Sequence, residues 1–128
     1  MDQTGRERRE PEERFAGNAH LFDLAVSARG LRDEDQQARQ GHRQVTLVHD
    51  NGITVVLFDF EADGQLPNHA ADGLVMIQVI AGMIEVSTPD DMHSMTAGSL
   101  LVLAAGVQHD VSAREPSQML LTVHLRHA

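Results

Sequence analysis

The stretch LVMIQVIAGMIEVS, residues 74–87, is the part of the sequence that most clearly indicates the fold. Residues 74–80 form a short apolar run typical of a β-strand, and residues 83–87 form a second one. Only Ala81 and Gly82 separate them, which favours a tight break between consecutive strands. The stretch therefore predicts β-structure at the centre of the chain.

The same succession of short strands and turns continues outward in both directions. Upstream, Asp50-Asn51-Gly52 is a strong hairpin signal because Asn-Gly accepts positive φ, and Asp63-Gly64 turns the chain again. We expect strands over residues 45–49, 53–60, 74–80, 83–87, 92–95, 99–103, 108–113 and 119–125. Many short strands at near-regular spacing predict an all-β sandwich or barrel, which occupies residues 44–128.

The first 43 residues have a different character. Residues 1–16 are almost entirely charged and polar, which predicts a disordered tail. Asn18 is an expected N-cap and Gly30 an expected stop for a short amphipathic helix. Its apolar positions are Leu21, Leu24, Ala25 and Ala28. Residues 31–43 are polar and indicate a loop, so we expect residues 17–43 to pack on the barrel or on a partner subunit.

Residues 74–80 are apolar on both faces of the predicted strand, whereas one face of an antiparallel sheet is normally polar and solvated. Either the N-terminal helix or another subunit has to cover the second face. The helix is short, so we expect a homodimer.

Composition excludes several kinds of partner. All ten cationic residues are arginines, and residues 44–113 contain none of them but nine carboxylates. Nucleic-acid binding needs cations to replace phosphate counterions, so nucleic acid is not an expected partner. The chain also lacks Tyr and Trp, the usual platforms for stacking bases. An anionic ligand is disfavoured unless a metal supplies positive charge, which leaves a neutral or cationic small molecule.

The chain has no cysteine, so disulfides and thiolate metal sites are excluded. Its longest apolar runs are too short to span a bilayer, and the charged N-terminus does not resemble a signal peptide. We therefore expect a cytoplasmic protein that does not use a membrane partner.

Two segments resemble the motifs of the cupin superfamily. The family's first motif is Gly, five residues, His-x-His, three or four residues, Glu, six residues, Gly. GQLPNH, residues 64–69, begins a similar segment that has one residue fewer before the histidine and closes at Gly82. The second motif is Gly, five residues, Pro-x-Gly, two residues, His, and GSLLVLAAGVQH, residues 98–109, resembles it with Ala104 in place of proline. The resemblance covers about two-thirds of the chain and implies a small stand-alone bacterial cupin, an antiparallel jelly-roll β-barrel.

The resemblance also implies where a divalent metal ion (Zn, Ni, Mn or Fe) would bind. His69 stands at the family's first ligand position and His109 at the last. The second His position is Ala71 and the Glu position is Val75, so two of four ligands remain. Catalytic zinc sites generally use three protein ligands and structural sites four, so the expected site is a weak one.

Other side chains are candidates for a third ligand. Asp72 lies close to His69 in the same predicted loop and is the preferred candidate. Gln78 is three residues beyond Val75 on a strand and should face the other way. His124 has no predicted facing, Asn68 is a poor ligand, and His49 and His93 are expected to be solvated.

Two functions remain open. His69 and His109 fit a small-molecule or weak metal-binding module without catalysis. In that case they are either weak ligands or polar residues at the barrel mouth, bonded to each other, to Asp72 or to Asp110. The alternative is a metal-dependent cupin enzyme of the dioxygenase or isomerase type, which uses the same two histidines. No nucleophile elbow, phosphate-binding glycine loop or HExxH motif is present.

Overall fold

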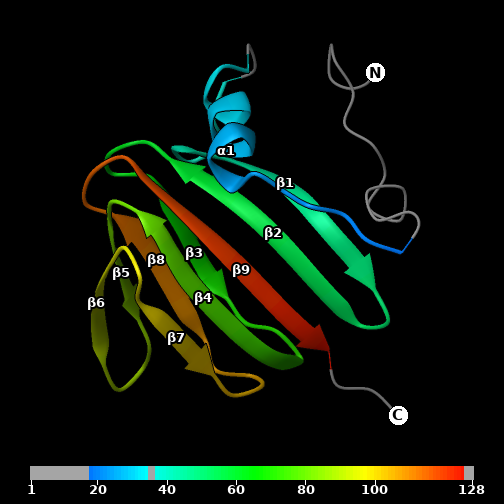
Figure 1. Cartoon of the computed structure of the whole chain (residues 1–128). Coiled ribbons are helices and arrows are strands. Elements are labelled where there is room, and N and C mark those ends of the chain that lie inside the picture. The colour runs from blue at the N-terminus through cyan, green and yellow to red at the C-terminus, as the bar shows by residue number, and fades with distance from the viewer. Residues whose placement is uncertain (1–17, 35–36, 126–128) are drawn as a thin grey trace.

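Two antiparallel sheets face each other in the structure, a computed structural model that describes residues 18–34 and 37–125 (Figure 1). The predicted charged tail over residues 1–16 lies outside these residues. One sheet has the strand order β1-β2-β9-β4-β7 and the other β3-β8-β5-β6. The elements are α1 (Leu24–Arg32), β1 (His42–Asp50), β2 (Ile53–Phe60), β3 (Gln65–His69), β4 (Gly73–Ala81), β5 (Met83–Ser87), β6 (Met92–Thr96), β7 (Leu100–Leu103), β8 (His109–Ala113) and β9 (Ser117–Leu125). The prediction of an all-β antiparallel jelly roll with a short N-terminal helix is confirmed.

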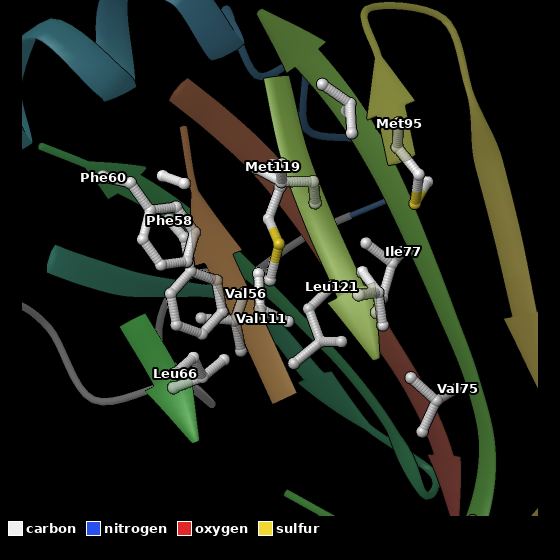
Figure 2. Packing of buried hydrophobic residues seen from close by; sticks show 14 of the residues in the cluster. Val56, Phe58, Phe60, Leu66, Val75, Ile77, Met95, Val111, Met119 and Leu121 are labelled. Carbon is white, nitrogen blue, oxygen red and sulfur yellow. The ribbon is translucent and has the colours of Figure 1, made fainter. Parts of the chain in front are cut away.

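The core lies between the two sheets, because each strand turns alternate side chains inward. Phe58, Met119 and Ile77 come from the five-stranded sheet and meet Leu66 and Val111 of the four-stranded sheet (Figure 2). All five side chains are buried. Residues with large apolar side chains fill the barrel over most of its length, so polar chemistry is confined to its ends.

One strand was not predicted. Gln65–His69 forms β3, an edge strand of the four-stranded sheet, where the sequence analysis expected a loop. Pro67 breaks the alternation of the segment and cannot donate a ladder hydrogen bond, which is tolerated at an edge. In addition, β1 begins at His42, three residues before the strand predicted from Val45.

The helix begins and ends later than predicted. It spans Leu24–Arg32, and the N-cap is Asp23, whose carboxylate accepts a hydrogen bond of 3.2 Å from the backbone N–H of Val26. The prediction of Asn18 as N-cap was therefore wrong. Gly30 does not stop the helix, because the next turn is held by tertiary packing. No helix in the described ranges is long and apolar enough to cross a membrane.

The apolar face of α1 lies on the five-stranded sheet. Ala28 and Leu31 are buried against Leu47 of β1 and Leu57 of β2. Leu21, which the predicted stripe included, precedes the helix and is 95% exposed. The burial of Leu31 explains why the helix continues past Gly30, since an isolated helix of this length has little stability of its own.

An ion pair joins the end of the helix to the sheet. Arg32 donates two hydrogen bonds to Asp59 of β2, from Nη2 to Oδ1 at 2.7 Å and from Nε to Oδ2 at 3.2 Å. The Asp59 side chain is 1% exposed and that of Arg32 is 49% exposed. The carboxylate raises the pKa of the guanidinium above its ordinary value, chiefly through this hydrogen bond. The pair connects the C-terminal end of α1 to β2 through two charge-assisted hydrogen bonds.

Candidate functional site

His69 and His109 come together at one end of the barrel, which we call the mouth. The mouth is formed by residues 70–72, 88–91 and 104–108. The backbone N–H of Gly106 donates to the carbonyl of Ala71 at 2.8 Å, and this bond ties two of these segments together. Residues 88–91 lie beside residues 104–108. Ser87, which directly precedes the first of these segments, pairs with Asp110 of β8, which follows the second.

A β-bulge explains why the two histidines share the inner face. Leu66 pairs with Val111, and both are core residues. His109 lies two residues before Val111 and therefore faces inward as well. His69 lies three residues after Leu66 and would face outward on a regular strand. The register of β3 shifts between Leu66 and His69, and the extra residue sets His69 directly opposite His109.

The ring of His109 is buried and has a defined proton. Its Nδ1 lies 3.2 Å from the carbonyl oxygen of Val107, and only 3% of the residue is exposed. A carbonyl oxygen can only accept, so Nδ1 carries a proton, and in the neutral ring Nε2 presents a lone pair. A backbone carbonyl orients metal-ligating histidines in the same manner.

His69 is more exposed, and its ring centroid lies 6.1 Å from that of His109 with 45° between the ring planes. Desolvation lowers the pKa of His69 below its ordinary value near 6.5. The neighbouring imidazoles of His109 and His42 lower the pKa further, and the carboxylate of Asp110 opposes them. Since its neutral form is favoured, His69 is available at neutral pH as an acceptor or a ligand.

His42 is a polar residue of the barrel interior that the sequence analysis missed. Its ring lies 5.5 Å from the ring centroids of both Phe58 and Phe60, and it is buried. Nδ1 lies 2.9 Å from the carbonyl oxygen of Gln65 and therefore donates to it. His42 stands in the polar stretch predicted as a loop, and no feature of the sequence distinguishes it there.

The two positions at which the resemblance implies further ligands are apolar. Val75 is buried in the core, as Figure 2 shows. Ala71 is partly buried and packs against the same core. Leu101, Val107 and Val123 also pack half-buried against this core. Apolar side chains therefore occupy both of the further ligand positions that the resemblance implies.

The other candidate ligands lie elsewhere. Gln78 is exposed on the outer face of β4, as its spacing from Val75 predicts. His124 is exposed and pairs with Leu74 on the same outer side. His49 is exposed, and its Nδ1 lies 3.0 Å from Oγ1 of Thr54. His93 is half-buried on the edge strand β6.

The donor set fits a weakly held metal ion and does not fit a four-ligand centre. Over residues 18–34 and 37–125, no group of three or more His, Cys, Asp or Glu side chains is placed to hold a metal ion. Asp72 is exposed, and its role as a third ligand stays a prediction. Two imidazoles alone leave most coordination positions to water.

A pocket of about 210 Å³ opens beside His109. Its lining consists of hydroxyl, amide, imidazole and carboxylate side chains and one proline: Ser87, Thr88, Pro89, Gln108, His109 and Asp110. The volume is below that of ordinary drug-sized sites, which suits a small molecule. The lining contains no arginine, which disfavours an anion and suits a neutral or cationic hydrogen-bond donor.

Several solved structures resemble this one. A conserved protein of unknown function from Streptococcus pyogenes is 23% identical, with a TM-score of 0.69 over 88% of this chain and 93% of its own. A cupin superfamily protein from Desulfitobacterium hafniense is 12% identical, with a TM-score of 0.70 over 88% of this chain and 96% of its own. KdgF from a Halomonas species is 21% identical, with a TM-score of 0.62 over 74% of this chain and 90% of its own.

These likenesses establish the architecture. The chain matches no sequence model of a protein family and no curated protein sequence. At identities below 25%, the similarity to solved structures concerns the fold. The chain has the cupin fold, and its chemistry has to be argued from its own residues.

Proposed function

We propose that this cupin-fold protein is a small cytoplasmic binding module. Its barrel mouth takes a small neutral or cationic molecule, or a weakly held divalent metal ion, and does not catalyse a reaction. The observation that carries the proposal is the opposed pair of imidazoles, His69 and His109, with apolar Ala71 and Val75 at the two further ligand positions.

The hydrogen bonding of the pair supports binding. The Nδ1–H of His109 is already used by the Val107 carbonyl, so Nε2 is an acceptor for a ligand N–H or O–H group or for a metal ion. The lowered pKa of His69 keeps a second acceptor neutral. A ligand that donates a hydrogen bond to one or both rings replaces the water that would otherwise donate to these nitrogens.

Among the described residues, no group of three side chains is placed to hold a metal ion, which argues against catalysis by a resident metal. A catalytic centre must hold its ion through many turnovers, and zinc enzymes do so with three protein ligands. With two imidazoles, an ion exchanges freely and serves as a reversible partner. A metal-dependent dioxygenase or isomerase remains the second candidate. The carbonyl-anchored ring of His109 favours it, since that arrangement is typical of metal-ligating histidines.

Calorimetric titration of metal-free protein with Zn²⁺ and with Ni²⁺ tests the proposal. Wild type is expected to bind one ion reversibly, and His69→Ala and His109→Ala are each expected to lower the affinity by more than about tenfold. His49→Ala and His124→Ala are matched controls, because both rings are exposed and neither belongs to the pair. Equal affinities of wild type and the double variant His69→Ala/His109→Ala would exclude the pair as a metal site.

A further inference from the structure

A tight turn at the start of β1 lies against β3, which belongs to the other sheet. The turn spans residues 39–42, and its end residues bond to each other. The backbone N–H of Arg39 donates to the carbonyl of His42 at 3.0 Å, and the reverse bond measures 2.9 Å. The central residues Gln40 and Gly41 have positive φ values of 51° and 77°. Positive φ at both central residues is typical of a two-residue hairpin turn, so the turn is well defined on its own.

The turn engages both backbone hydrogen-bonding groups of Gln65 in β3. The N–H of Gln65 donates to the carbonyl of Gln40 at 2.9 Å. The carbonyl of Gln65 accepts from Nδ1 of His42, also at 2.9 Å. We call these two bonds the clasp. The clasp joins β1 of the five-stranded sheet to β3, an edge strand of the four-stranded sheet, so it connects the two sheets.

Two glycines let the turn approach the segment before β3. A Cβ on Gly41 would lie 2.6 Å from Cα of Gly64, closer than a side chain can come. The backbone N–H of Glu61 donates to the carbonyl of Gly41 at 2.8 Å, and Gly64 donates to the carbonyl of Glu61 at 2.9 Å. The clasp therefore stands on a close backbone contact in addition to its own two bonds.

The ring of His42 is packed where it takes part in the clasp. The residue is 5% exposed, and its ring centroid lies 5.5 Å from those of Phe58 and Phe60. The two phenylalanines stack on each other at 5.8 Å and belong to the core of the barrel. Close packing restricts the ring of His42, so its Nδ1–H stays directed at β3.

The clasp holds one end of the segment that contains the bulge. The register of β3 shifts between Leu66 and His69, directly after the clasp. Beyond the shift, the carbonyl of Ala71 accepts from the N–H of Gly106 at 2.8 Å. The bulged segment is therefore anchored at both ends. An edge strand with a weakly specified register can slip by one residue, which turns its side chains to the opposite face.

We propose that His42 is the positioning residue of the histidine pair. By holding β3 at Gln65, it fixes the start of the bulge that sets His69 opposite His109. His42 acts through the backbone of β3 and not on the ligand itself. Its imidazole is also near enough to contribute to the lowered pKa of His69. The effect on binding rests on the proposed function, whereas the effect on the geometry of the pair does not.

NMR spectroscopy of the metal-free full chain tests the geometry. The first readout is hydrogen exchange at the amide of Gln65, which the clasp protects. The second is the nuclear Overhauser contact between backbone protons of His69 and His109, which reports their pairing. His42→Leu removes the donor and should abolish this contact and speed the exchange at least about tenfold. His42→Asn retains an N–H near the position of Nδ1 and should preserve both readouts.

Calorimetric titration with Zn²⁺ measures the effect on binding. His42→Leu is expected to lower the affinity about tenfold, as the loss of groups that orient metal ligands does, and His42→Asn should restore most of it. His49→Leu is the matched control, because His49 is an exposed histidine of the same strand. A wild type that binds no Zn²⁺ would overturn the proposed function, and the NMR readouts would still decide the role of His42 in the geometry.

Gly41→Ala should open the clasp by a second route and reproduce the NMR changes of His42→Leu, because a Cβ there would collide with Gly64. Circular dichroism and the exchange of the β4 and β9 amides check that each variant is folded. A folded His42→Leu variant that keeps the contact between His69 and His109 would overturn the proposal. So would a His42→Asn variant that loses this contact, because the hydrogen bond would then not be what positions β3.

Discussion

His69 and His109 lie directly opposite each other on β3 and β8 because β3 contains one residue more than its partner strand between Leu66 and His69. Without this bulge, the imidazole of His69 would face solvent on the outer side of the barrel. The pairing places two acceptor nitrogens at the mouth. The candidate site therefore depends on the bulge in the edge strand β3.

The pKa of His69 is the first testable consequence. Measured by NMR titration of the metal-free protein, it is expected below the ordinary value near 6.5. His109→Ala should raise it only in part, because desolvation is the larger cause, and Asp110→Asn should lower it further. Shifts of the same sign in both variants would contradict this assignment of causes.

The lowered pKa of His69 also determines how protein stability and metal binding depend on pH. A lowered pKa in the folded state means that the unfolded chain takes up the proton first as the pH falls. The contribution of His69 to stability is therefore complete above pH 6.5 and is lost as the pH falls from there through the lowered pKa. Metal occupancy should fall over the same range, because only neutral imidazole ligates. Occupancy that is constant from pH 7.5 to about 4.5 would contradict a histidine site.

Asp72 provides a test of the number of ligands. Asp72→Ala is expected to lower the affinity for Zn²⁺ less than His69→Ala or His109→Ala does, because its exposed carboxylate belongs to no described ligand group of three. Glu115→Ala, which also removes an exposed turn carboxylate, serves as the control for net charge. A loss as large as that of the histidine variants would make Asp72 a third ligand.

The ion pair between Arg32 and Asp59 should matter for stability. Arg32→Ala leaves the buried Asp59 carboxylate without its guanidinium, and we expect a loss of about 2 kcal/mol in the free energy of unfolding. Arg29→Ala removes an exposed arginine from the same helix and should cost less than about 0.5 kcal/mol. Urea denaturation measures both values, and equal effects would show that the pair is not what anchors the helix.

Two glycines should respond in opposite directions to alanine. Gly82 has a φ of 88°, and a Cβ there would collide with Ser117 and with the Pro116 carbonyl, so Gly82→Ala is expected to destabilise by at least about 1 kcal/mol. Gly30 lies inside α1 with open space around it, and Gly30→Ala should stabilise by about 0.5–1 kcal/mol. Thermal unfolding compares the two, and a stabilising Gly82→Ala would refute the turn geometry.

Much of the barrel was predictable because two-residue periodicity and turn residues are local signals. Asn51 and Gly52 do form the first hairpin with positive φ, and Gln78 does face away from Val75. The ends of α1 were not predictable in this way. Its extension past Gly30 depends on the burial of Leu31 against strands that are distant in sequence.

The two histidines of the candidate site could be named from the sequence, but their geometry could not. The motif spacing singled out His69 and His109, whereas their opposition depends on a bulge between Leu66 and His69 that no local pattern reveals. His42 was missed because it stands in a polar stretch of sequence and becomes buried only when β1 pairs with β2. Long-range strand pairing decides both features.

Elemental analysis of the purified protein after dialysis against a chelator tests the central claim most directly. The account predicts no stoichiometric metal after this treatment. It also predicts that Zn²⁺ or Ni²⁺ added back binds reversibly to wild type and not to the variant lacking both His69 and His109. One tightly retained ion per chain would contradict the account, because two imidazoles cannot hold an ion against a chelator. It would establish further ligands and move the metal-dependent enzyme ahead of the binding module.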